Sequence, residues 1–180
     1  MKNQNTKKLA YAALFLALCL VLPMLTGQIP QIGSMLLPMH IPVLLCGLVC
    51  GWQYGAAVGF VAPLLRSVLF GMPPMYPVAI AMAFELLTYG LVIGLVYRRM
   101  AQKGAAGVYA ALLTAMVAGR LVWGVAEVVL LGLGGKAFTA QAFLAGALLN
   151  AVPGIIVQLV LTPAVMAALQ KAGAVKEYAE

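Results

Sequence analysis

The chain contains several continuous apolar runs that are long enough to cross a lipid bilayer, and no other feature restricts its fold as much. A helix needs roughly 20 apolar residues to cross about 30 Å of hydrocarbon. The runs lack the alternation of period two that a membrane β-barrel requires, so they predict helices. We therefore predict an all-α membrane protein with a single domain, 1–180, that is a bundle of six transmembrane helices over residues 8–25, 36–50, 54–70, 77–97, 108–133 and 140–169.

Two parts of this prediction leave alternatives open. The Pro-rich stretch 23–42 is compatible with a loop, a broken helix or a re-entrant turn. The N-terminus combines basic residues with an apolar run, as a secretory signal peptide does, but no small-x-small cleavage site follows and the run ends at Pro23-Met24. We expect a first helix that is retained.

The basic residues predict the orientation of the bundle. They gather before the first predicted span, between the fourth and fifth, and after the sixth: Lys2, Lys7, Lys8, Arg98, Arg99, Lys103, Lys171 and Lys176. With six crossings these segments share one side, which the positive-inside rule makes the cytoplasm, so we expect both termini inside. The topology accounts for the net charge of +7, and no basic patch with interleaved aromatic residues indicates nucleic-acid binding.

The chain lacks the motifs of most catalytic sites. No Gly-x-x-x-x-Gly-Lys-Ser/Thr is present to hold nucleotide phosphates, so the energy for any driven transport must come from another subunit. His40 is the single histidine, which excludes a His-based metal cluster, and we interpret Cys46 and Cys50 as buried thiols. We expect no catalytic residue, no metal and no cofactor.

Four ionisable residues lie inside the apolar runs, namely Arg66, Glu85, Arg120 and Glu127. A charge at bilayer depth costs about 3 kcal/mol on insertion scales, so such residues tend to face a bundle interior or a wet cavity. At about 1.5 Å per residue, Glu85, Arg120 and Asn150 fall at similar depths, and Arg66 lies close to the outer end of its span. The four helices that carry Arg66, Glu85, Arg120 and Asn150 predict a cavity that opens outward.

Helical periodicity supports this cavity. Arg120, Trp123 and Glu127 form one stripe, as do Met82, Glu85 and Tyr89, and as do Asn150, Gly154 and Gln158. An aromatic ring beside a charge suits an amphipathic organic ligand, and Arg offers a planar fork for a carboxylate.

Simpler interpretations stand beside this one. Glu85 and Arg120 could form a structural ion pair, Arg66 could snorkel to the outer interface, and Glu127 could be solvated at the rim. A lone histidine such as His40 is more often a hydrogen-bonded structural residue than a ligand-binding one.

Small residues recur four apart in several spans. The pairs Gly47–Gly51, Gly55–Gly59 and Gly90–Gly94 predict close packing between helices inside the bundle. Ala13 and Ala17 lie on the first span near the basic N-terminus. They are compatible either with internal packing or with a surface on which a partner membrane protein docks.

Several of these stretches, in this order, resemble the substrate-binding S components of energy-coupling factor (ECF) vitamin transporters of bacterial cell membranes. They are Ala13-Leu14-Phe15-Leu16-Ala17, Pro38-Met39-His40-Ile41-Pro42 before a Gly-rich span, Pro63-Leu64-Leu65-Arg66-Ser67, Gly71-Met72-Pro73-Pro74, and Glu85-Leu86 with Tyr89-Gly90-Leu91. The resemblance implies capture of a vitamin on the outer side and docking of Ala13 and Ala17 on a transmembrane coupling subunit shared with two ATPase subunits. It further implies that loops 24–42 and 71–77 close over the ligand.

Within that family the chain looks most like the pantothenate-type members, through the Met39–Pro42 region and Arg66. Arg66 or Arg120 would hold the carboxylate, Asn150 and Glu85 the polar groups, and Trp123 the gem-dimethyl end, with Tyr89 and His40 beside them. The same residues would also suit vitamin B6, folate or a pyrimidine precursor, although the small aromatic content favours a non-aromatic ligand. The competing hypotheses are a stand-alone ion-coupled carrier that uses Glu85 and Arg120 as a relay, and a small intramembrane enzyme, which the missing motifs disfavour.

Overall fold

A computed structural model describes residues 2–26, 36–135, 139–146 and 151–173, and this part of the chain is helical without a β-strand. Five helices are long and apolar enough to cross a membrane. The elements in chain order are α1 (Lys2–Val21), η1 (Leu22–Thr26), α3 (His40–Cys50), α4 (Trp52–Phe70), η2 (Met75–Ala79), α5 (Ile80–Met100), η3 (Ala101–Lys103), α6 (Ala105–Leu133), α7 (Ala140–Leu144) and α8 (Val152–Lys171).

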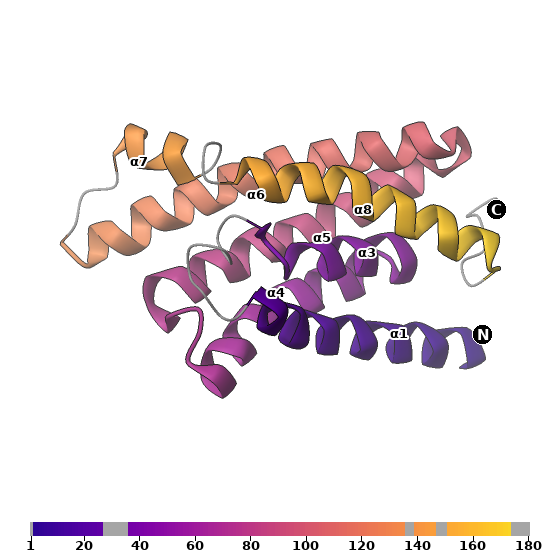
Figure 1. Cartoon of the computed structure of the whole chain (residues 1–180), viewed down its shortest axis with the longest axis horizontal. Helices are drawn as coiled ribbons and strands as arrows, with labels where there is room; N and C mark the ends of the chain where they lie inside the picture. The colour runs from indigo at the N-terminus through magenta and orange to yellow at the C-terminus, as the bar shows by residue number, and fades with distance from the viewer. Residues whose placement is uncertain (1, 27–35, 136–138, 147–150, 174–180) are drawn as a thin grey trace.

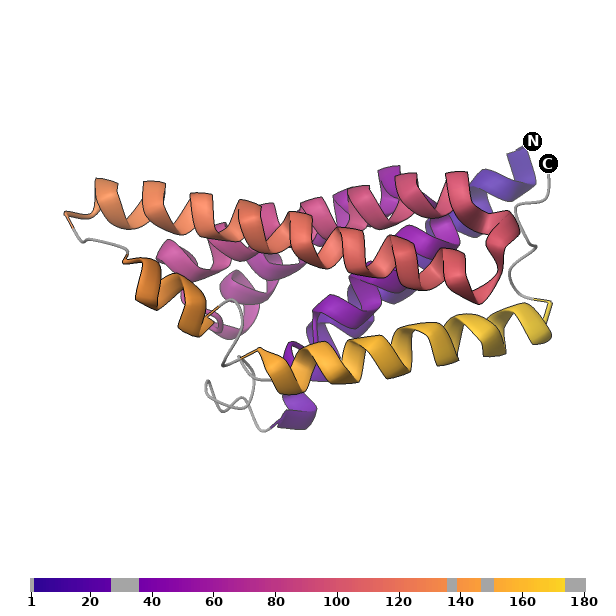
Figure 2. The same ribbon diagram turned by 90° about the horizontal axis from the view of Figure 1, so that it is seen from above.

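The helices lie side by side in a bundle whose interior is α3 (Figure 1). In Figure 1, α6 and α8 lie along the upper edge of the bundle and α1 along its lower edge, and in Figure 2 the end of α6 near Leu133 extends beyond its neighbours with α7 folded back beside it. The start of α1 and the end of α8 lie at the same end of the molecule. The all-α membrane architecture predicted from the apolar runs is therefore confirmed.

The second predicted span is a shorter helix than the sequence indicated. It begins at His40 because Leu37 adopts a left-handed backbone with φ 51° and Pro38 follows it. Its 11 residues reach about 16 Å, which is too short to cross the hydrocarbon. Every residue from Pro42 to Cys50 is buried, so α3 is a core helix enclosed by the longer ones.

The sixth predicted span is also not continuous. Its first part is the short helix α7, its second part is α8, and residues 147–150 between them lie outside the described part of the chain. Asn150, a predicted binding residue, lies in that gap and thus outside the described residues. The other spans match their predicted ranges to within a few residues, with α5 and α6 extending further toward the basic end.

Glycines bring α4 and α5 into direct backbone contact. A Cβ atom on Gly90 would lie 2.2 Å from the carbonyl carbon of Gly55, and one on Gly59 would lie 2.2 Å from the carbonyl oxygen of Leu86. A Cβ atom on Gly94 would lie 2.5 Å from the backbone nitrogen of Trp52. Since lipid gives helices no hydrophobic reason to associate, such close approach is how they hold together. The predicted internal role of these glycines agrees with this packing.

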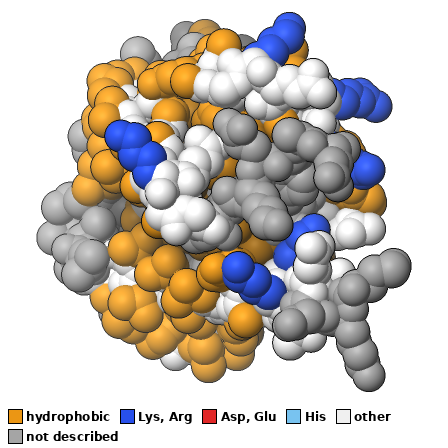
Figure 3. Space-filling model, turned by 90° about the vertical axis from the view of Figure 1, so that its right-hand side faces the viewer, with side chains coloured by type: hydrophobic (Ala, Val, Ile, Leu, Met, Phe, Trp, Pro, Cys, Tyr) orange, Lys and Arg blue, Asp and Glu red, His pale blue; other side chains and the backbone are white. Residues whose placement is uncertain are grey.

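Basic side chains stand at the end of the molecule where α1 begins and α8 ends (Figure 3). They come from the last turn of α5 (Arg98 and Arg99), from η3 (Lys103) and from the last turn of α8 (Lys171). The α5–α6 connection and the α8 end, which the sequence assigned to one side, are thus at one end of the bundle.

Candidate functional site

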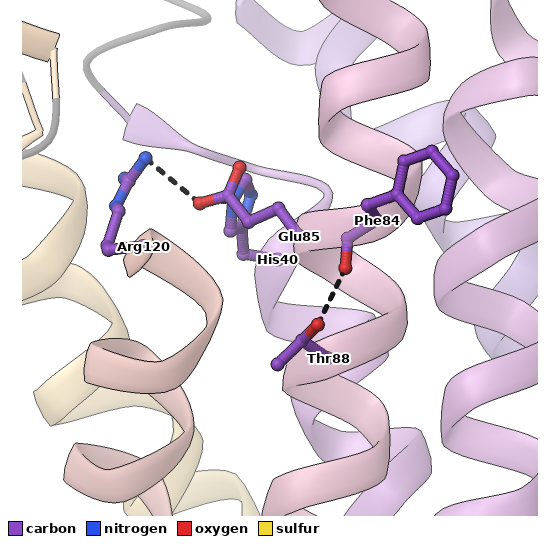
Figure 4. A network of polar contacts seen from close by, with 5 residues as sticks. All are labelled: His40, Phe84, Glu85, Thr88 and Arg120. Carbon is purple, nitrogen blue, oxygen red and sulfur yellow. Dashed lines mark hydrogen bonds and ion pairs between the residues drawn. The ribbon is translucent and has the colours of Figure 1, made fainter. Parts of the chain in front are cut away.

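The centre of the site is an ion pair between α5 and α6. Glu85 lies 15 residues before the end of α5 at Met100, and Arg120 lies 15 residues after the start of α6 at Ala105, so the two residues reach the same height in the bundle. Arg120 Nη1 is 2.9 Å from Glu85 Oε1. Figure 4 shows Arg120 extending from α6 toward the carboxylate. The pair that depth along the helices suggested is present.

His40 completes this cluster from the first turn of α3. Its Nε2 atom lies 3.5 Å from Glu85 Oε1, and both side chains are almost fully buried. The ring of Tyr89, one turn further along α5, meets the His40 ring edge-on at a centroid distance of 5.2 Å. Gly119 makes room for that tyrosine, because a Cβ atom there would lie 2.1 Å from Tyr89 Cε1. Sequence reasoning missed Gly119, although Ala115, four residues earlier on α6, gives it the same small-residue spacing as the glycine pairs.

Arg120 keeps one edge of its guanidinium group unused. Nη1 faces Glu85, whereas Nε and Nη2 are buried without a hydrogen-bond partner in the described part of the chain. Nε–H and one Nη2–H lie on the same edge of the planar group and point in the same direction, which is the geometry that grips a carboxylate with two parallel bonds. Buried donors are expensive to leave unpaired, so this edge indicates an anionic binding partner.

Two stacked aromatic side chains lie beside the Arg120 guanidinium group. Arg120 Cζ lies 5.9 Å from the centre of the Trp123 ring, which stacks on Phe143 of α7 at 6.1 Å. Two glycines allow this contact, since a Cβ on Gly124 would meet Phe143 and one on Gly146 would meet Trp123. Phe143 of α7 and Gly146, two residues beyond the end of α7, thus lie against the tryptophan.

Arg66 is placed differently from the expectation. It donates a hydrogen bond to the carbonyl oxygen of Leu20 at the end of α1, and its guanidinium carbon lies 5.2 Å from the Phe70 ring centre. The residue is 2% exposed, which does not favour the alternative that its side chain snorkels to the outer interface, and its role in binding stays a prediction. Its described contacts join α4 to α1, away from the Glu85–Arg120 pair.

Glu127 also differs from the expectation. It is 6% exposed, so it is not a solvated residue at the rim. No Lys, Arg or His nitrogen of the described residues lies within 4.0 Å of its carboxylate. Its burial follows from contacts with neighbouring elements, which the pattern along α6 alone cannot reveal.

Two further polar side chains are buried on α8. Gln158 and Thr162 are one turn apart, both are fully buried, and neither finds a hydrogen-bond partner in the described ranges. Gln158 belongs to the stripe seen in the sequence, whereas Thr162 was missed. The signal that could have found it is its position four residues after Gln158 on the same face.

The outer loops are partly described. Met75–Ala79 of the second loop forms η2, and Tyr76 donates a hydrogen bond to the carbonyl oxygen of Leu130 on α6. Residues 27–35 of the first loop lie outside the described residues. A groove of about 360 Å³ lies between α6 and α7, but its walls, including Leu121, Val125 and Phe143, are apolar. That groove lacks the polar groups that orient a soluble ligand.

Ala13 and Ala17 are exposed on α1, together with Leu14 and Val21. In the described residues no group of three His, Cys, Asp or Glu side chains has the arrangement of a metal site. The three cysteines are free thiols and are buried.

Comparison with known families gave one match. The family model described as "ECF transporter, substrate-specific component" matches residues 7–166. No match was found among curated proteins or among solved structures.

Proposed function

Because the chain belongs to the family of substrate-specific components of ECF transporters, we propose that it captures a vitamin, with pantothenate as the best candidate, on the outer side of the membrane. Membership of the family and five apolar spanning helices make it a multi-pass protein of the cell membrane that serves substrate uptake. Such a protein works with an ECF module of membrane and ATPase subunits. Beyond family membership, we propose which ligand the protein binds, how the bundle is oriented in the membrane and which surface docks on the coupling subunit.

The observation that carries the ligand proposal is the unused edge of Arg120. Nε and Nη2 are buried and unpaired, while Glu85 holds Nη1 in place. A carboxylate would satisfy both donors at once, and the carboxylate of Glu85 already fixes the plane in which the ligand would lie. A ligand with an anionic planar group therefore fits better than a bare cation.

Pantothenate has the remaining features that the cluster would accommodate. Its gem-dimethyl group would pack on Trp123, and its amide would reach His40 and Tyr89. Both ring nitrogens of His40 lack a hydrogen-bond partner in the described part of the chain. Gln158 of α8 is a further candidate for the polar groups, and so is Asn150, which lies outside the described residues. A vitamin B6 form, folate or a pyrimidine precursor would use the same donors.

The orientation follows from the basic end. The Lys and Arg residues of the α5–α6 connection and of the end of α8 would face the cytoplasm under the positive-inside rule. Both termini would then be inside. Glu85 and Arg120 lie about 22 Å from that end, which would put the site in the outer half.

The docking proposal concerns α1. Ala13 and Ala17 are exposed rather than packed inside the bundle, so their small side chains leave a flat strip on which another helix could approach closely. We propose that this strip contacts the coupling subunit.

A binding screen tests the ligand proposal. The purified chain in detergent would be assayed by thermal shift and native mass spectrometry against pantothenate, biotin, lipoate, thiamine, riboflavin, pyridoxine and folate. We expect a stoichiometric complex with pantothenate. In liposomes, uptake should require the coupling subunit, both ATPases and ATP. Uptake by this chain alone would instead support an ion-coupled carrier, and the absence of any bound vitamin would contradict the proposal.

A further inference from the structure

Glu127 is a buried residue whose carboxylate has no opposite charge beside it among the described residues. It lies on α6 in a membrane span, is 6% exposed, and has no basic nitrogen of the described residues within 4.0 Å. Such a group costs free energy at bilayer depth, and isolated examples mark ligand or ion pathways. The Glu85–Arg120 pair does not use it, so its role needs a separate explanation.

The position of Glu127 relates it to Arg120. The two residues are seven apart on one continuous helix, which places them on the same face, two turns and about 10 Å apart along the axis. Trp123 lies between them on that face. The face of α6 therefore presents, in order, the open edge of a cation, an aromatic ring and an unpaired carboxylate.

Neighbouring elements turn this face inward. Val125, Val128 and Val129 around Glu127 are exposed and would face lipid, whereas the glutamate is not. The hydrogen bond from Tyr76 to Leu130, three residues beyond Glu127, holds η2 against this part of α6. The low exposure of Glu127, together with the face that it shares with Arg120 and Trp123, puts it on the side of α6 that holds the site.

We infer that Glu127 is the second pole of the ligand site, where it accepts hydrogen bonds from the end of the ligand that is remote from Arg120. An ionised carboxylate can only accept, so the ligand must supply O–H or N–H donors there. This deepens the proposed function, on which it rests, by defining a substrate class: an elongated organic acid whose anionic group and hydrogen-bond donors lie at opposite ends, with an apolar middle against Trp123.

The class excludes ligands that carry only the anionic group or only the hydrogen-bond donors. An acid with an apolar tail would bury the Glu127 carboxylate without supplying it with a hydrogen-bond donor. A ligand with donors but no anion would leave the Nε and Nη2 edge of Arg120 unpaired. A cation without an acid group would be repelled by Arg120. Pantothenate and biotin belong to the class, lipoate has the acid alone, and panthenol, the alcohol of pantothenate, has the donors alone.

The first measurement is the affinity of the wild-type chain in detergent for these four compounds and for thiamine and riboflavin, by titration calorimetry. We expect pantothenate or biotin to bind at least about 100-fold more tightly than lipoate or panthenol, since each lost contact to a charged group costs about 10- to 100-fold. Binding of thiamine or riboflavin in preference would overturn the inference and leave the transport function standing. Binding of no vitamin would contradict the function itself.

The second measurement uses Glu127→Gln and Glu127→Leu, with Val125→Ala as the control on the lipid face of the same turn. The glutamine variant should bind the preferred acid about 10-fold more weakly, and the leucine variant about 100-fold more weakly. The weak affinity for lipoate should stay the same or rise in the leucine variant, because the donor-free tail then meets an apolar residue. Val125→Ala should change none of these values.

A structural role would give a different result. If Glu127 only holds the fold, its variants should lower the thermal midpoint without ligand and weaken pantothenate and lipoate equally. The inference instead expects an unchanged or higher midpoint for Glu127→Leu, because a buried unpaired charge is removed. Unchanged affinity for the preferred acid in Glu127→Leu would overturn it.

Discussion

At the scale of single residues, Arg120 would serve two partners at once under the proposed function. Glu85 occupies Nη1 and thereby compensates the positive charge in a region where water is scarce. The same contact fixes the guanidinium plane, so the Nε and Nη2 edge is aimed before any ligand arrives. Preorganised donors lose little side-chain entropy on binding, which favours high affinity.

Replacing Arg120 by alanine tests this division of roles. The ligand would lose its two parallel bonds and Glu85 would be left without its cation, so binding should weaken by about 3 kcal/mol or more. Calorimetric titration of the purified variant with the vitamin found in the screen measures this. Arg66→Ala is the comparison, because Arg66 contacts Leu20 and Phe70. Arg66→Ala should lower the thermal midpoint and leave vitamin affinity largely unchanged. If Arg66→Ala instead weakens binding and Arg120→Ala only lowers the midpoint, the two arginines have the opposite roles.

The residues of the cluster were predictable in part. Depth along each helix suggests that Glu85 and Arg120 meet, because both positions are fixed by the helical rise from the same end of the bundle. The direction of Arg66 was not predictable, since it depends on Leu20 of α1, which lies far away in the sequence. The contact of Gly119 was not predictable either, because it is made with the ring of Tyr89, which lies on another helix.

At the scale of elements, the contact between α4 and α5 depends on glycine. Gly55, Gly59 and Gly90 let two backbones touch where any side chain would collide. Gly47 extends the contact to α3, because its own Cβ would lie 2.8 Å from the Gly90 carbonyl oxygen. Glu85 and His40 are carried by α5 and α3, so this packing also sets the distance between them.

Gly90→Ala should therefore destabilise the protein strongly. The added methyl group would meet backbone atoms of Gly55, which cannot move aside as a side chain can, and overpacking of this kind costs about 3 kcal/mol. Gly132→Ala is the matched control, because a Cβ there meets nothing within 4 Å and alanine favours the helix. Thermal unfolding in detergent compares the two. Equal midpoints would show that the close contact does not limit stability.

The elements themselves were largely predictable, because continuous apolar runs leave few alternatives to helices. The short α3 was harder to predict. Its apolar composition resembles that of a span, and the left-handed Leu37 that delays its start is visible only in the structure. The division of the sixth run into α7 and α8 was missed for a related reason, since hydropathy continues across the break.

At the scale of the whole molecule, two surfaces have different characters. The faces of α6 and α8 expose large side chains such as Val117, Leu121, Ile156 and Val160, which suit lipid. The exposed face of α1 also carries small residues, Ala10, Ala13 and Ala17, beside the larger Leu14 and Val21. A partner helix can approach a small-residue strip closely, whereas bulky side chains hold it away.

Ala13→Trp should separate binding from assembly. The indole would project from the exposed strip of α1, far from Glu85 and Arg120, so vitamin affinity should be unchanged. Association with the coupling subunit should be lost, because the two helices could no longer approach. Co-purification with the tagged ECF module measures this, with Val160→Trp on the exposed face of α8 as the control. Assembly by the Ala13 variant would move the docking surface elsewhere.

The glycine contact between α4 and α5 also has a use in spectroscopy. Two backbones that touch at Gly55 and Gly90 cannot slide or separate without opening the core, so this helix pair moves as one body. Spin labels at the exposed positions Val61 and Leu95 should report a constant separation in every step of transport. This constant distance would serve as an internal reference. Distances from these two positions to further labels on α1 or η2 would show which parts of the protein change position.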